Sequence, residues 1–143
     1  MGLSCGKTLH RHAKIGPRMS KIPIARLQNL CDPFNDNPWD CEGGPITTEE
    51  IASCIEEGNL VDVPVLSREE RHRHIGRIAY LAMNGWDDAI SVDVGVPSLG
   101  CHVDWPIEDG NHRFAAAIYG DKEFIEANLS GSCDYLLELF ATT

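Results

Sequence analysis

The sequence predicts an α+β fold, with a small mixed sheet and flanking helices. Helical and strand patterns are mixed along the chain without a regular βαβ repeat, which favours this class over a doubly wound parallel sheet. At 143 residues, 43% hydrophobic and 24% charged, the chain has the size and composition of one globular core. We expect a single domain over residues 21–143, preceded by a basic, flexible arm over residues 1–20.

The first elements are predicted from alternation and from capping residues. Apolar and polar residues alternate over Lys21–Leu27, and Pro23, which has no amide hydrogen, places this short strand at a sheet edge. A proline- and glycine-rich stretch follows and predicts a loop. Thr47 and Glu50 have the spacing of a capping box, and Gly58 suits a left-handed helix end. We therefore expect a helix between Thr47 and Gly58.

A strand and a longer helix are predicted next. Alternation over Leu60–Leu66 predicts the strand. Ser67 and Glu70 form a second potential capping box, which opens a helix that runs to Asn84. Its first half is basic, and we expect these side chains to form a solvated face that pairs with acids elsewhere in the chain: Arg68, Arg71, His72, Arg73, His74 and Arg77.

The C-terminal elements follow the same rules. Ile90–Val94 alternates as a strand, and Val103–Glu108 is extended. A helix is expected from Asn111 to a stop at Gly120. Glu123–Asn128 suits either a strand or a helical turn. Asp134–Phe140 predicts a final helix with apolar residues along one side.

The charge is unevenly distributed along the chain. The net charge is −10, yet residues 1–31 contain six Lys and Arg and no acid, while the remaining residues carry six Lys and Arg against 22 acids. An acidic body repels the phosphate backbone of DNA, so DNA binding is expected only through the basic residues 7–26. The acidic surface instead favours a protein partner.

Cysteine spacing and hydropathy bound the class further. The six cysteines form no Cys-x-x-Cys pair, so zinc and thioredoxin signatures are absent, and reduced thiols are expected. No apolar run approaches the roughly 20 residues that cross a bilayer. The basic N-terminus lacks the apolar core of a secretory signal. We therefore expect a cytoplasmic protein with no membrane partner.

The most informative stretch predicts a strand, a tight glycine turn and a helix. A helix N-terminus presents unpaired N–H groups and attracts anions. Gly110 has no Cβ and allows close approach of the backbone to a ligand. Arg113 offers a planar fork that matches phosphate, Asn111 is placed to orient the ligand, and His112 can donate a hydrogen bond or exchange a proton. We predict a phosphate site at Gly110, Asn111, His112 and Arg113, with His112 as donor or acid.

Two carboxylates precede this turn. Glu108 and Asp109 cannot hold phosphate directly, but they can bind a Mg²⁺ ion that does, and in that role they are candidate catalytic residues. Asp109 serves equally well as a turn or cap residue. Both readings of Asp109 stay open.

The string Asp109-Gly-Asn-His-Arg113 with its alanine-rich helix resembles the phosphate-binding box of the ParB/sulfiredoxin superfamily. Upstream, the Ile22–Leu27 segment is similar to the family's first strand and the Asp32–Pro38 loop to its first motif. The helix Glu49–Gly58 followed by Leu60–Leu66 is similar to its first helix-and-strand unit, so that the resemblance covers about 100 residues. It implies a ParB/sulfiredoxin-like fold and nucleotide binding.

Departures from the family pattern limit the activity that the resemblance implies. Sulfiredoxins carry a catalytic cysteine between the glycine and the histidine; here Asn111 occupies that position, so sulfinic acid reduction is not expected. The family's first motif supplies an arginine, which the Asp32–Pro38 loop lacks. A centromere-binding clamp is therefore not expected.

Three hypotheses follow. The first is a phosphoryl-transfer or nucleotide-hydrolysing enzyme, which the intact Asp109–Arg113 string favours. The second is a non-catalytic protein-interaction module on the same fold, which the missing first-motif arginine favours. The third is a ParB-like nuclease, against which the acidic body counts.

Overall fold

The computed structural model describes residues 15–140. They contain a four-stranded mixed sheet and a set of helices, which confirms the α+β class. The chain divides into two compact units. We call residues 15–31, 89–110 and 123–140 the sheet unit, and residues 32–88 and 111–122 the helical unit.

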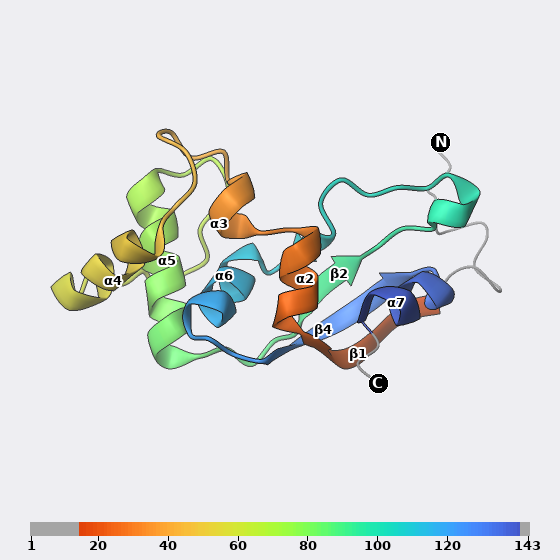
Figure 1. Ribbon diagram of the computed structural model, residues 1–143. Coiled ribbons are helices and arrows are strands. Elements are labelled where there is room, and N and C mark those ends of the chain that lie inside the picture. Colours follow the sequence, from red (N-terminus) through yellow and green to blue (C-terminus); the bar gives the residue numbers. More distant parts are fainter. Residues whose placement is uncertain (1–14, 141–143) are drawn as a thin grey trace. The chain divides into compact units, whose positions relative to one another are not determined.

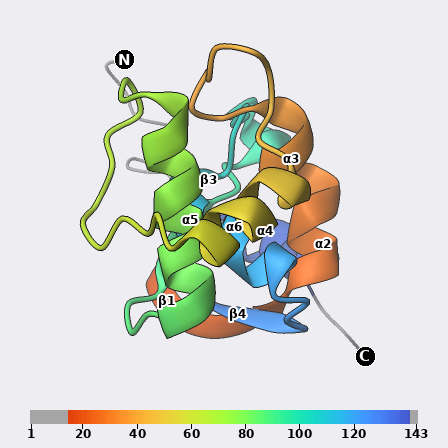
Figure 2. The same ribbon diagram turned by 90° about the vertical axis from the view of Figure 1, so that its left-hand side faces the viewer.

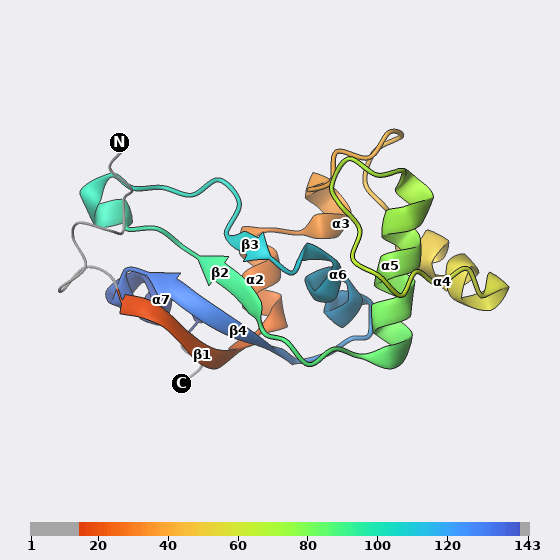
Figure 3. The ribbon, with the colours of Figure 1, turned by 180° about the vertical axis from the view of Figure 1, so that it is seen from behind.

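The sheet unit contains all four strands in the order β1-β4-β2-β3 (Figure 1). They are β1 (Ile15–Pro23), β2 (Ile90–Asp93), β3 (Ile107–Asp109) and β4 (Phe124–Gly131). The β2 strand runs parallel to β4 and antiparallel to β3, and it lies between them in Figure 3. The β1 strand pairs with β4 alone, which confirms the predicted edge position.

The predicted strand over Lys21–Leu27 is wrong in its second half, because the chain turns into helix α2 (Ile24–Leu30) directly after Pro23. Ile24 and Leu27 lie three residues apart and are both buried, which only a helix achieves on one face. The amide of Ile24 donates to the carbonyl of Glu123 at 2.9 Å, so the sheet hydrogen bonds end there.

Two further helical segments complete the sheet unit. The 3-10 turn η1 (Pro97–Leu99) lies between β2 and β3, and α7 (Cys133–Phe140) confirms the predicted final helix. The segment that suited either a strand or a turn is the strand β4. The extended segment predicted over residues 103–108 is a strand only at its end, in β3. The β1 strand begins inside the predicted arm, whose residues 1–14 lie outside the described part.

The helical unit contains α3 (Pro33–Asp36), α4 (Thr48–Glu57), α5 (Arg71–Asn84) and α6 (Asn111–Tyr119). The α5 helix contacts both α4 and α6, and Figure 2 shows α4 in front with α5 at its side. Their buried side chains form one hydrophobic cluster: Trp39, Cys41, Ile46, Ile51, Cys54, Ile78, Ala79, Leu81, Ala115 and Ala116. The alanines of α6 keep its buried face small, which allows close packing on α5.

The α4 helix confirms the first predicted capping box. Glu50 N donates to Thr47 Oγ1 at 3.2 Å, and Thr47 N donates to Glu50 Oε1 at 2.9 Å. Gly58 ends the helix with φ +76°, a left-handed conformation that favours glycine. The boundaries of this helix are therefore set by its own sequence.

The predicted strand over Leu60–Leu66 is wrong. This segment pairs with no strand in the described chain, and Pro64 removes one of the amides that pairing would need. Its amide at Val61 instead donates to the carbonyl of Gly76 in α5, at 3.1 Å.

The second predicted capping box is also wrong, because α5 begins at Arg71 and not after Ser67. Its N-cap, Glu70, makes no side-chain capping bond. Glu69 accepts a hydrogen bond from Leu66 N at 2.8 Å and closes a turn before the helix. The predicted end at Asn84 is confirmed.

No helix within residues 15–140 has the length and apolarity that a bilayer span requires. The five cysteines of the described part are free thiols, and Cys31, Cys41 and Cys54 are buried.

Candidate functional site

The predicted site residues belong to two different units. Glu108 and Asp109 end β3 in the sheet unit, and Gly110 follows them there. Asn111, His112 and Arg113 form the first turn of α6 in the helical unit. Each set therefore has its own surroundings.

Gly110 must be a glycine. Its φ of +111° lies outside the region that other residues adopt. A Cβ built there would lie 2.7 Å from Ile90 Cβ, in the neighbouring strand. The group that lies close to Gly110 is the side chain of Ile90, and the predicted approach of the backbone to a ligand stays a prediction.

Glu108 and Asp109 are exposed on β3, where Asp109 pairs with Ser91 of β2. Within residues 15–140, no three or more His, Cys, Asp or Glu side chains gather as a metal-binding group. The Mg²⁺ site at these two carboxylates stays a prediction.

The first turn of α6 presents the groups predicted for anion binding. The leading amides of a helix have no intrahelical acceptor, and their dipoles add a partial positive charge. Asn111 and Arg113 are both half-buried. Arg113 Nη1 donates to the carbonyl of Asp88 at 3.0 Å, which orients its guanidinium beside the start of α6.

His112 is half-buried and stacks with two buried rings, a contact that the sequence did not reveal. Its ring lies 4.8 Å from the ring centroid of Trp39 and 5.2 Å from that of His74, in near-parallel planes. His112 Nε2 lies 2.9 Å from His74 Nδ1. His74 is fully buried, so its predicted place on a solvated basic face is wrong.

Hydrogen bonding assigns the tautomers of both rings. His74 Nε2 lies 3.2 Å from the carbonyl oxygens of Ser67 and Glu69, and because a carbonyl only accepts, this nitrogen carries the hydrogen. Burial lowers the pKa of His74, so the ring is neutral and Nδ1 has a lone pair. That lone pair accepts from His112 Nε2–H, which leaves His112 Nδ1 as an acceptor.

Burial also lowers the pKa of His112 to about 3, with smaller contributions from His74, Arg77 and Arg113. The ring is therefore neutral at physiological pH and exchanges no proton there. Its one N–H is bonded to His74. These two facts disfavour the predicted role of His112 as phosphate donor or acid.

Arg71 is a structural clamp and not part of a solvated face. Its guanidinium donates to both carboxylate oxygens of Glu50, at 2.6 and 2.9 Å, and to the carbonyls of Glu42, Gly44 and Pro45. These bonds occupy all five of its N–H groups. The hydrogen bonds from Arg71 lower the pKa of Glu50 to about 2. Arg71 therefore fixes the loop before α4 and has no donor left for a ligand.

Other members of the basic run behave as predicted. Arg73 pairs with Glu69 at 3.1 Å, and exposed His72 lies 3.4 Å from Glu70. His72 and His74 point apart, as residues two apart on a helix must. One signal marked His74 as different, because it lies four residues before the buried Ile78 and shares its face.

No protein-family model, curated protein or solved structure matches this chain. The resemblance to the ParB/sulfiredoxin superfamily therefore rests on the residues quoted for it.

Proposed function

We propose that the chain is a ParB/sulfiredoxin-like domain that binds a nucleotide through its phosphate at the first turn of α6. The order of elements carries this proposal. The Asp109–Arg113 string spans the end of a strand, a glycine with φ +111° and the start of a helix, which is the order that the resemblance requires.

Binding rests on backbone amides and one cation. The amides of Asn111, His112 and Arg113 are the leading donors of α6, and the helix dipole favours an anion there. Arg113 adds a charge-assisted donor, and its bond to the Asp88 carbonyl restricts its rotamers before a ligand arrives. Glu108 and Asp109, which belong to the sheet unit, are the carboxylates that would hold a Mg²⁺ ion.

Nucleotide binding without acid–base catalysis is the form of this proposal that the surroundings of His112 support. A catalytic acid or base works best with a pKa near the operating pH. The pKa of His112 is about 3, and its N–H already donates to His74. We therefore place His112 in the packing that supports the site.

Thermal unfolding with nucleoside mono-, di- and triphosphates and Mg²⁺ tests the proposal. A ligand at about 100 times its Kd adds about 2.7 kcal/mol of stability. For a chain of this length the unfolding entropy is roughly 0.3 kcal/mol/K, so the midpoint should rise by about 9 °C. Arg113→Ala should abolish most of this rise.

Arg26→Ala is the matched control. Arg26 also donates through Nη1 to a backbone carbonyl, that of Leu139, but on α2 in the sheet unit. This variant should keep the full rise. If no nucleotide raises the wild-type midpoint, or if Arg113→Ala keeps the rise, the phosphate site is refuted.

A further inference from the structure

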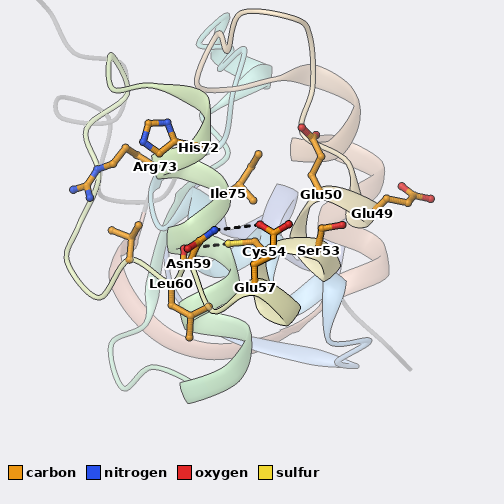
Figure 4. A pocket seen from close by; sticks show the side chains of 11 residues that line it. Glu49, Glu50, Ser53, Cys54, Glu57, Asn59, Leu60, His72, Arg73 and Ile75 are labelled. Carbon is orange, nitrogen blue, oxygen red and sulfur yellow. Dashed lines mark hydrogen bonds between the residues drawn. The ribbon is translucent and has the colours of Figure 1, made fainter.

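A groove in the helical unit has the shape and charge of a site for a basic amphipathic helix. It has a volume of about 620 Å³ and lies between α4, the segment after it and α5 (Figure 4). Its lining combines apolar and acidic side chains with two basic ones: Glu49, Glu50, Ser53, Cys54, Glu57, Asn59, Leu60, Val61, His72, Arg73 and Ile75. This groove includes none of the residues of the proposed phosphate site.

The segment that lines the groove after α4 is fixed to α5 and α4 by close contacts. A Cβ at Gly76 would lie 2.8 Å from the carbonyl oxygen of Asn59, so only glycine lets the segment lie this close to α5. Val61 N donates to Gly76 O at 3.1 Å, and Cys54 Sγ donates to Asn59 O at 3.1 Å. A glycine inside a helix is less favourable than alanine. This close approach explains why the helix carries one.

The floor of the groove is apolar and partly exposed. Leu60 is 38% exposed, and Val61 and Ile75 are half-buried. An apolar side chain placed on them would remove this surface from water, which stabilises the complex. The floor therefore favours an apolar anchor.

The acidic wall carries two carboxylates without a cation. Arg71 pairs with Glu50, and Arg73 pairs with Glu69. In the described chain, Glu49 and Glu57 accept hydrogen bonds only from neighbouring polar side chains and pair with no cation. Eight residues separate them on α4, which is about 12 Å along the axis. The wall thus presents two negative charges about two helical turns apart.

We propose that this groove binds an amphipathic helix of a partner protein, with an apolar anchor on the floor and two cations facing Glu49 and Glu57. Lysines or arginines at i and i+7 of a helix are about 10.5 Å apart, and their long side chains span the remaining difference. Apolar residues at i+3 and i+4 lie between them on the same face. This is the groove mode of helix recognition.

Fluorescence anisotropy with a designed peptide tests the proposal. The probe is a labelled helical peptide of about 15 residues, with lysines at i and i+7 and leucines at i+3 and i+4. Its control has the same composition, with lysines and leucines on opposite faces. The protein should bind the probe saturably and the control peptide at least about tenfold more weakly, because only the probe fills floor and wall together.

Protein variants distinguish binding in the groove from nonspecific attraction of a basic peptide to an acidic protein. Glu49→Gln with Glu57→Gln should weaken probe binding about tenfold. The matched control is Glu56→Gln with Asp62→Asn, which removes two exposed acids that do not line the groove and should change binding less than twofold.

The apolar floor has its own pair of variants. Leu60→Ser should weaken binding about tenfold, whereas Leu66→Ser removes an exposed leucine outside the groove and should leave it unchanged.

Three results would overturn the proposal. They are no saturable binding of the probe, equal binding of the control peptide, and equal losses in the groove variants and their controls. Sedimentation of the protein alone adds a fourth. A dimer that Glu49→Gln with Glu57→Gln abolishes would assign the groove to a second copy of this chain.

Discussion

Acidification from pH 7.5 to pH 5.0 should destabilise the helical unit because its folded state holds two histidines in the neutral form, buried His74 and half-buried His112. The pKa of His112 is about 3 in the folded chain, against an ordinary value of 6.5, and burial lowers the pKa of His74 as well. Between about pH 3 and pH 6.5, His112 is protonated in the unfolded chain and neutral in the folded chain. Stability is therefore full above pH 6.5 and falls as the pH drops toward 3.

The magnitude follows from the His112 pKa. At pH 5.0 the unfolded imidazole is mostly protonated and the folded one is not, so the free energy of unfolding falls by about 2 kcal/mol relative to pH 7.5. His74 adds a loss of the same sign. The stability that Glu50 gains from its lowered pKa is present above about pH 4.5 and is lost only toward pH 2, so it does not contribute to this window.

Urea unfolding followed by circular dichroism at both pH values measures the difference. His112→Phe keeps an aromatic ring against Trp39 but removes the titrating group, so the difference between the two pH values should shrink by about 2 kcal/mol. His72→Gln is the control, because His72 is exposed on α5 and takes no part in the stack of His112, so this variant should keep the wild-type difference.

Two observations would refute this reasoning. One is a wild-type stability that stays constant between pH 7.5 and pH 5.0. The other is an equal reduction of the pH difference in His72→Gln and His112→Phe, which would place the titration elsewhere in the chain.

Two further predictions concern stability. Arg71→Ala should lower the free energy of unfolding in a urea titration by about 2–3 kcal/mol, because it leaves Glu50 and three backbone carbonyls without their half-buried partner. Arg68 is exposed, and Arg68→Ala should change the free energy of unfolding by less than about 0.5 kcal/mol. Equal effects of the two variants would contradict the conclusion that the hydrogen bonds of Arg71 stabilise the fold. Gly110→Ala should lower the free energy of unfolding by about 3 kcal/mol, because of the positive φ at Gly110 and the clash of a Cβ with Ile90. Its thermal midpoint should lie well below that of the control Gly100→Ala, where φ is also positive but a Cβ meets no other atom within 4 Å.

Local sequence rules account for part of the fold. The helix from Thr47 to Gly58 was predicted with its capping box and its left-handed end, because each signal acts within four residues of the backbone that it stabilises. The start of α6 at Asn111 and its end at Gly120 follow in the same way. The edge position of β1 follows from one missing amide, that of Pro23.

Alternation was misleading where the tertiary environment decides. Lys21–Leu27 and Leu60–Leu66 both alternate, yet the first turns into helix α2 and the second packs irregularly on α5. A strand needs a partner, and pairing depends on segments distant in sequence. The Leu60–Leu66 segment instead contacts α5 at Gly76, where the absence of a Cβ lets the two backbones lie close together.

The candidate site also has features set by the local sequence and features set by tertiary packing. The sequence by itself determined the strand–glycine–helix order around Gly110, because glycine and helix-start signals are local. Only the tertiary structure decided the state of His112, since His74 lies 38 positions away and reaches it through the packing of α5 on α6. Burial makes both imidazoles neutral, and burial is a property of the folded chain that no short stretch of sequence carries.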